Sequence, residues 1–194
     1  MSSDPAGHFL LQLILVKRRA IDMVEPETDL LGIPVPSDNK FFLTIVVIHI
    51  LLGIICVLSG LVAMLSRKAR GRHPLAGKIY YWGLFLIFIT VIPLSIMRWP
   101  VNNHLLVLGF LSFLLAHFGK KLAGNAMPGW TRSHTACMGS SYIFLLTAFY
   151  VDNGKNLPFW KQFPELLFWL FPAVIGIPII IYVLRNHPLN RKNA

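Results

Sequence analysis

The sequence predicts an all-α fold: a bundle of five transmembrane helices, preceded by an N-terminal helix that lies on the membrane surface. Two observations predict it. Of the 194 residues, 55% are hydrophobic and only 13% are charged, whereas soluble domains carry about a quarter charged residues. The apolar residues also gather in runs of about 20, the length that a helix needs to cross a hydrocarbon core about 30 Å thick. This composition excludes a soluble enzyme.

Five windows of the sequence are apolar and long enough, or nearly so, to cross a bilayer. The fourth is the weakest because hydroxyl residues such as Ser141 and Thr147 interrupt it. Such hydroxyls can bond back to their own helix or across to a neighbouring one. We therefore expect a five-span domain over 41–185 and a tail over 186–194, with the spans at 41–65, 79–97, 101–122, 135–151 and 166–184.

The distribution of charged residues predicts the orientation of these spans. Of the 18 Lys and Arg residues, eleven lie in the first connection, the third connection and the tail, where there is no acid. The other side holds seven basic residues and all eight acids. The positive-inside rule then places the N-terminus outside and the C-terminus in the cytoplasm. Because long apolar runs separate the basic clusters, the net charge of +10 indicates membrane orientation and no nucleic-acid partner.

Residues 1–40 are expected to lie outside. The run 8–16 is apolar but too short to span, and the basic residues follow it, whereas a signal peptide carries them before its apolar run. An interfacial helix explains both features. The stretch 25–39, with three prolines and several acids, predicts an extended connector into the first span, or alternatively a lid over the outer face.

Histidines are the ionisable residues that lie deepest in these windows. No Asp, Glu, Lys or Arg lies deep within any of them, which disfavours carboxylate-based proton coupling. Imidazoles on neighbouring helices can instead ligate haem iron. We therefore take His49, His104, His117 and His134 as candidate cofactor ligands. The outer pair would be His49 with His104, and the inner pair would be drawn from His73, His117 and His134. His49 is the expected metal ligand on the outer side and His134 the one on the inner side.

A plainer interpretation of these histidines stays open. His49 lies above Gly53 and Gly60 at helical spacing, and small residues there let a neighbouring helix approach and bond to the imidazole. Met138 shares a helix face with His134, but a methionine in such a position is more often a packing residue.

The basic loop after the first window favours a lipid contact. Arg70, Arg72, His73 and Lys78 lie together there, and such clusters bind anionic lipid headgroups at the cytoplasmic face. The alternative function is therefore a non-enzymatic membrane module that binds lipid, a partner membrane subunit or a second copy of itself.

Three short motifs resemble an uncharacterised family of small membrane proteins found mainly in bacteria. They are His-Ile-x-x-Gly, His-x-x-x-Gly-[Arg/Lys]-x-Tyr, and His-x-x-x-Met followed by Ser-Tyr, and in this chain they begin at His49, His73 and His134. More distantly, the bundle is similar to cytochrome b561 and ferric reductase proteins, in which histidines on neighbouring helices ligate b-type haem. That resemblance implies haem b as cofactor and transmembrane electron transfer as function.

Overall fold

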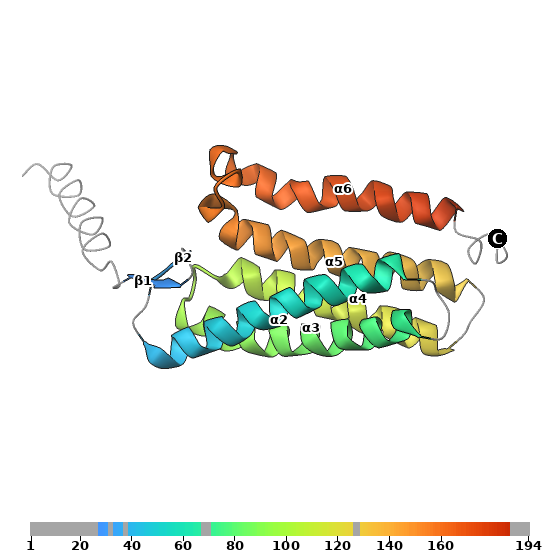
Figure 1. The fold of residues 1–194 in the computed structure, drawn as a ribbon, viewed down its shortest axis with the longest axis horizontal. Helices are drawn as coiled ribbons and strands as arrows, with labels where there is room; N and C mark the ends of the chain where they lie inside the picture. The colour runs from blue at the N-terminus through green and yellow to red at the C-terminus, as the bar shows by residue number, and fades with distance from the viewer. Residues whose placement is uncertain (1–26, 31–32, 37–38, 67–70, 126–128, 187–194) are drawn as a thin grey trace, which may run out of the picture. The chain divides into compact units, whose positions relative to one another are not determined.

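In the computed structural model of the protein, long helices run alongside one another over most of the chain (Figure 1). The residues described are 27–30, 33–36, 39–66, 71–125 and 129–186. The long helices among them are α2 (Lys40–Leu65), α3 (Arg72–Met97), α4 (Asn103–Asn125), α5 (Trp130–Asn153) and α6 (Glu165–Asn186). The short 3-10 helices η1 (Gly154–Asn156) and η2 (Trp160–Gln162) lie between α5 and α6. The chain divides into two compact units, residues 1–44 and 45–194.

The first unit contains a β-hairpin. Strand β1 (Glu27–Leu30) pairs antiparallel with β2 (Ile33–Pro36), with Glu27 opposite Pro36 and Leu30 opposite Ile33. Both strands of a two-stranded sheet are edges, where a proline without a backbone N–H is tolerated. The predicted connector is thus extended, and its two halves pair with each other. Apart from this short hairpin the described elements are helices, as the predicted all-α fold requires. The predicted surface helix over 8–16 lies outside the described residues.

Asn39 starts the first long helix. Its side-chain Oδ1 accepts a hydrogen bond from the backbone N–H of Phe41 at 2.9 Å. Asparagine is a preferred residue at a helix N-terminus because its side chain satisfies one of the N–H groups that the first turn leaves without a partner. Helix α2 therefore begins at Lys40, as the apolar window from residue 41 predicts.

The second unit is an up-and-down bundle in which each helix runs antiparallel to the one before it. Between α2 and α3, His49 contacts Thr90 and Ala63 contacts His73, so residue numbers rise on one helix as they fall on its neighbour. The later pairs follow the same pattern. Helices α3 and α4 meet at Tyr81 with His117 and at Phe88 with Phe110. Helices α4 and α5 meet at Ser112 with Ser141 and at Gly119 with His134, and helices α5 and α6 meet at Gly139 with Ile180 and at Ile143 with Gly176.

Four of the described helices are long and apolar enough to cross a bilayer, as expected of a multi-pass membrane protein. They are α2, α3, α4 over Asn103–Gly124, and α6. Helix α5 is not among them, because its hydroxyl residues lower its mean hydropathy. It nevertheless has 24 residues, which is about 36 Å at 1.5 Å per residue, and it packs against both α4 and α6.

Two helices begin well before their predicted apolar windows. Helix α3 starts at Arg72 where the window starts at residue 79, and α5 starts at Trp130 where the window starts at residue 135. Hydropathy marks only the part of a helix that faces hydrocarbon, whereas the helix itself continues into the headgroup region. His73 and His134 are therefore helical residues. At the other terminus α6 continues to Asn186, and the rest of the predicted tail lies outside the described residues.

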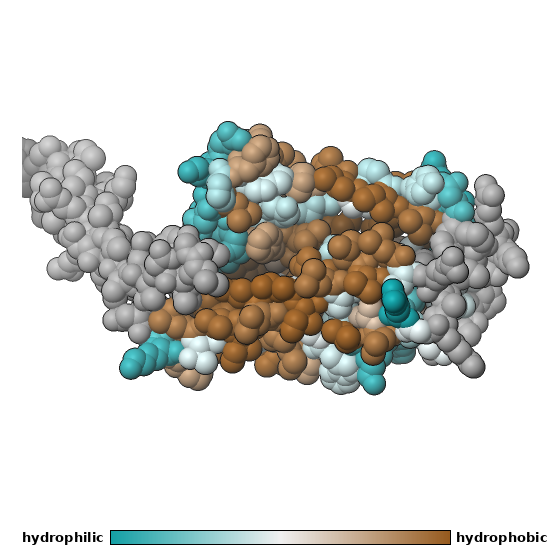
Figure 2. Space-filling model, in the orientation of Figure 1, coloured by the Kyte–Doolittle hydropathy of each residue, from teal (hydrophilic) through white to brown (hydrophobic). Residues whose placement is uncertain are grey.

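The described surface of the bundle separates apolar from charged residues. Figure 2 shows, on the face in view, apolar side chains along the helices and hydrophilic ones gathered at both ends of the bundle. The acids Asp152 and Glu165 lie where α5 ends and α6 begins. At the opposite end, which we call the basic end, lie Arg72, Lys78, Lys120, Lys121, Arg132 and Arg185.

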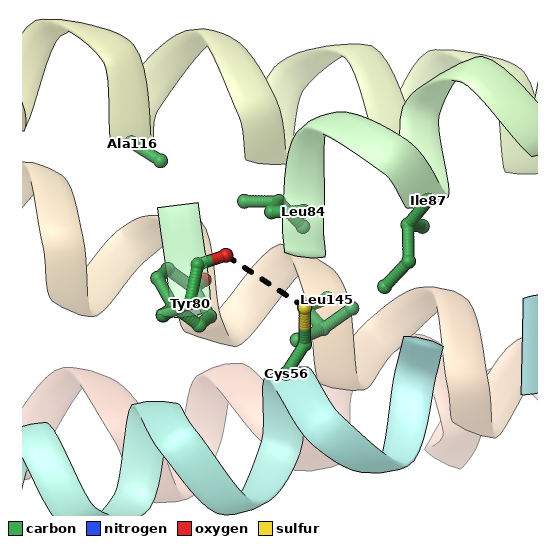
Figure 3. Packing of buried hydrophobic residues seen from close by; sticks show 6 residues of the cluster. All are labelled: Cys56, Tyr80, Leu84, Ile87, Ala116 and Leu145. Atoms are coloured by element: carbon green, nitrogen blue, oxygen red, sulfur yellow. Dashed lines mark hydrogen bonds between the residues drawn. The ribbon is translucent and has the colours of Figure 1, made fainter. Parts of the chain in front are cut away.

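The core of the bundle is a cluster contributed by four helices (Figure 3). Cys56 and Ala116 have no exposed surface, and Tyr80 is 2% exposed. The Cys56 thiol points at the carbonyl oxygen of Tyr80, with 3.7 Å between sulfur and oxygen, which is a weak hydrogen bond. Leu84, Ile87 and Leu145 complete the cluster. Both cysteines of the chain are free thiols.

Gly60 permits the close approach of α2 to the buried Tyr80 and the partly buried Tyr142, and this predicts a strong substitution effect. A Cβ atom at Gly60 would lie 2.6 Å from Cε2 of Tyr142 and 3.1 Å from Cδ2 of Tyr80, whereas one at Gly53 would meet nothing within 4 Å. We expect Gly60→Leu to lower the free energy of unfolding in detergent by about 1–3 kcal/mol through overpacking. Gly53→Leu should leave it unchanged or raise it, because leucine favours a helix more than glycine does. Equal losses in equilibrium unfolding would contradict this packing.

Candidate cofactor site

His73 and His134 lie side by side at the basic end. Their ring centroids are 6.4 Å apart, and the ring planes are inclined at 77°. His73 belongs to the first turn of α3, and His134 lies near the start of α5. Both side chains are partly buried. His73, which the sequence grouped with the lipid-binding residues, is thus a direct neighbour of the predicted inner metal ligand.

Each of these imidazoles is held by a backbone carbonyl of a further helix. Nδ1 of His73 lies 2.7 Å from the carbonyl oxygen of Ala63 on α2, and Nδ1 of His134 lies 2.8 Å from that of Gly119 on α4. A carbonyl oxygen can only accept, so Nδ1 carries the proton in both rings and Nε2 carries the lone pair of the neutral form. Proteins use this arrangement to orient histidines that ligate metals.

The histidine pair is the first of two matching contacts between α3 and α5, which run parallel. Tyr80 and Ser141 each follow their histidine by seven residues (80 − 73 and 141 − 134), two helical turns on. The Tyr80 hydroxyl and Ser141 Oγ are hydrogen-bonded at 2.7 Å. All four residues belong to the sequence motifs. The spacing of seven residues, equal in both motifs, is a signal that the two motifs face each other, and the sequence prediction did not use it.

Further hydrogen bonds extend this contact to α2 and α4. The Ser112 hydroxyl on α4 donates to the carbonyl oxygen of Ser141 at 2.8 Å. The Tyr142 hydroxyl on α5 donates to the carbonyl oxygen of Val57 on α2 at 3.0 Å. Together with Tyr80 these groups join four helices next to the histidine pair. Ser141 thus bonds across to a neighbouring helix, which is one of the two possibilities that the sequence leaves open.

His49 lies at a different level of the bundle. Its Nδ1 is 2.8 Å from Oγ1 of Thr90, whose hydroxyl donates its single proton to the carbonyl oxygen of Ile87. His49 is therefore the donor to Thr90, and its neutral ring also carries the lone pair on Nε2. Thr90 follows His73 by 17 residues (90 − 73), which is about 25 Å along a helix. His49 and His134 thus belong to separate levels, as their outer and inner assignment requires.

The other two predicted ligands contact aromatic residues. The ring of His104 lies 5.8 Å from that of Trp169. His117 is exposed, and its Nδ1 lies 3.1 Å from the Tyr81 hydroxyl. Among the described residues, the histidines that form a ring pair are therefore His73 and His134. Of the predicted lipid-binding residues, Arg72 and Lys78 are exposed at the basic end, and Arg70 lies outside the described residues.

The helix face beside His73 has open space. Gly77 lies between His73 and Tyr80 on this face of α3, and a Cβ atom built there would meet nothing within 4 Å. Gly119, next to His134, is packed instead: a Cβ atom there would lie 2.9 Å from Sδ of Met138. A side chain at position 77 would therefore meet no neighbour within 4 Å of its first carbon.

In the part of the chain that the structure describes, the two histidines do not belong to a larger group of metal ligands. Within the described ranges, no group of three or more His, Cys, Asp or Glu side chains could hold a metal ion, whereas a structural zinc site takes four such ligands. Haem needs fewer ligands from the protein. His73 and His134, with ring centroids 6.4 Å apart, are the two residues that would hold such a group, and it would supply a redox-active iron.

Comparison with known proteins adds no assignment. No protein-family model, curated protein or solved structure matches the chain. The functional assignment therefore depends on the residues that the bundle brings together at its basic end.

Proposed function

We propose that the chain is a five-span integral membrane protein that binds b-type haem through His73 and His134 and serves as an electron carrier. The observation that supports this most is the histidine pair itself. Two imidazoles on parallel helices lie 6.4 Å apart, and both direct Nδ1 at a carbonyl oxygen. When bound, haem b supplies reversible one-electron transfer at its iron.

The arrangement of α5 supports the fifth crossing. Contacts with α4 extend from Ser112 to Gly119, and contacts with α6 involve Gly176 and Ile180. Helix α5 therefore runs alongside two helices that are apolar enough to span. Two of its polar residues are satisfied inside the bundle: Ser141 Oγ is hydrogen-bonded to the Tyr80 hydroxyl, and the Thr147 hydroxyl donates to the carbonyl oxygen of Ile143. Such internal bonding lets a less apolar helix reside in a membrane.

The charges of the described residues support an orientation with the basic end in the cytoplasm. Six Lys and Arg residues gather there, and the bundle's two described acids lie at the other end. The positive-inside rule assigns the basic side to the cytoplasm. In this orientation the haem ligands face the cytoplasmic leaflet, and the N-terminus lies outside.

The protein's own residues would set the properties of the haem. The carbonyl oxygens of Ala63 and Gly119 fix the tautomer and the orientation of the two rings and raise the basicity of Nε2. Because these acceptors belong to α2 and α4, the ligands are held by four packed helices. His49 and His104 show no mutual contact in the described structure, so an outer haem stays a prediction of the sequence.

A visible absorption spectrum tests this proposal. We expect the full chain, purified in detergent after haem-replete expression, to show a Soret band and, on reduction, the sharp bands of a b-type haem with two histidine ligands. We also expect Gly77→Leu to remove most of the haem because the leucine fills the space beside His73. Gly53→Leu, an equal change at a second open position, should retain it. A folded wild-type protein without a Soret band would overturn the proposal.

A further inference from the structure

Lys120 on α4 is held over an aromatic ring of α3. Its Nζ lies 3.8 Å from the ring centroid of Tyr81 and 5.4 Å from that of Trp82, which is a cation–π geometry. The Tyr81 hydroxyl is hydrogen-bonded to Nδ1 of His117 at 3.1 Å, and this bond fixes the ring beneath the ammonium group. The exposed lysine thus keeps a defined position, and its N–H groups on the side away from the ring can donate to a ligand.

A second lysine lies at the same level. Helices α3 and α4 are antiparallel with Tyr81 beside His117. Lys78, one turn before Tyr81, and Lys120, one turn after His117, therefore reach the same level of the basic end. Both are exposed. The described carboxylates of the bundle lie at its opposite end, so none of them neutralises this pair of charges.

Below the two lysines, α3 presents an apolar stripe. Trp82, Leu86 and Ile89 follow Lys78 at spacings of four, eight and eleven residues, which places them on one helix face. All three are exposed. Positive charge at the membrane surface therefore continues directly into an apolar track that leads toward the middle of the bilayer.

We propose that Lys78, Lys120 and Tyr81 bind the phosphate headgroup of an anionic phospholipid, whose acyl chains lie along the stripe below. The lysine ammonium groups donate to the phosphate oxygens, and the Tyr81 ring positions one of them. Two cations without a carboxylate favour a lipid of net negative charge over phosphatidylcholine, whose choline carries the same charge as the lysines. The site uses neither His73 nor His134 and does not depend on haem.

Native mass spectrometry of the full chain tests this site. After equilibration in detergent with equal amounts of phosphatidylglycerol and phosphatidylcholine, we expect the protein to retain phosphatidylglycerol selectively. Lys120→Ala should lower this retention about fivefold, the factor that one basic residue contributes at an anionic surface. The matched control is Lys121→Ala, which removes an equal charge from the adjacent exposed position and should have a clearly smaller effect. Tyr81→Leu should resemble Lys120→Ala, and Tyr81→Phe, which keeps the ring, should retain more lipid.

Three outcomes would overturn the proposal. Equal losses for Lys120→Ala and Lys121→Ala would show a general attraction to basic residues and no site. Equal retention of the two lipids would remove the charge selectivity. Displacement of phosphatidylglycerol by millimolar inorganic phosphate would assign the site to a soluble anion. Lys120→Gln, which keeps a polar side chain at this exposed position, provides a second variant should the alanine variant fail to fold.

Discussion

Alanine at either His73 or His134 is expected to abolish the haem spectrum while the protein remains folded. Each imidazole donates from Nδ1 to a backbone carbonyl oxygen at 2.7–2.8 Å, so in the neutral ring the lone pair is on Nε2. Loss of either ring would remove one of the two residues that would hold the haem. The Soret band and the haem-to-protein ratio of the purified variants measure the effect.

Methionine at the same positions separates ligation from a structural role. Met ligates haem iron and raises its reduction potential relative to two histidines. We therefore expect His134→Met to recover part of the haem that His134→Ala loses, with an altered spectrum and a higher midpoint potential. If His134 had only a structural role, His134→Met would not shift the midpoint potential of the bound haem.

His117 and His104 provide matched controls. His117 lies toward the same end of the bundle but contacts Tyr81, and His104 packs near Trp169. Alanine at either position should leave the spectrum unchanged. Haem loss in these variants, with full retention in the His73 and His134 variants, would mean that the ligands were assigned to the wrong histidines.

The membrane architecture could be predicted from the sequence because it depends on composition and length. Apolar runs of about 20 residues fix where a chain can cross hydrocarbon whatever its tertiary contacts. The fourth window was the weakest for a physical reason that the structure makes clear. Ser141 and Thr147 lower the hydropathy of α5, yet both hydroxyls are satisfied by hydrogen bonds inside the bundle. A hydropathy average counts only the residues of the helix itself. It takes no account of the hydrogen-bond partners that neighbouring helices provide.

The sequence offers His73, His117 and His134 for the inner pair but does not single out which two meet, because spacing shows which residues share a face and not which faces meet. His73 was grouped with Arg72 and Lys78 as a lipid contact because the apolar window begins only at residue 79. Since α3 begins at Arg72, His73 is already part of the helix that packs beside α5. The hairpin could not be predicted for a related reason. Prolines argue against a strand unless that strand lies at the edge of a sheet. Which strands lie at an edge depends on their pairing, and the sequence does not show the pairing.

Tyr80 is the position at which we expect the largest loss of stability. Its side chain is 2% exposed, its ring touches the Gly60 position of α2, and its hydroxyl bonds to Ser141 on α5. We expect Tyr80→Ala to lower the free energy of unfolding in mixed micelles by about 2–3 kcal/mol, which is the cavity term for a lost aromatic ring without the transfer term that adds to it in soluble proteins. Transfer from water contributes little when the unfolded helices also lie in detergent, so the cost arises from packing contacts that the surrounding helices lose.

The ring and the hydroxyl of Tyr80 should contribute unequally. Tyr80→Phe keeps the packing and removes one hydrogen bond, and interhelical hydrogen bonds in membranes are worth only about 0.6 kcal/mol on average. Ser112 Oγ, 3.5 Å from Ser141 Oγ, can also take over as a partner of the Ser141 hydroxyl. A double-mutant cycle of Tyr80→Phe with Ser141→Ala should therefore give a coupling energy well below the loss in Tyr80→Ala. If Tyr80→Phe costs as much as Tyr80→Ala, then the polar network, and not close packing against Gly60, holds these helices together.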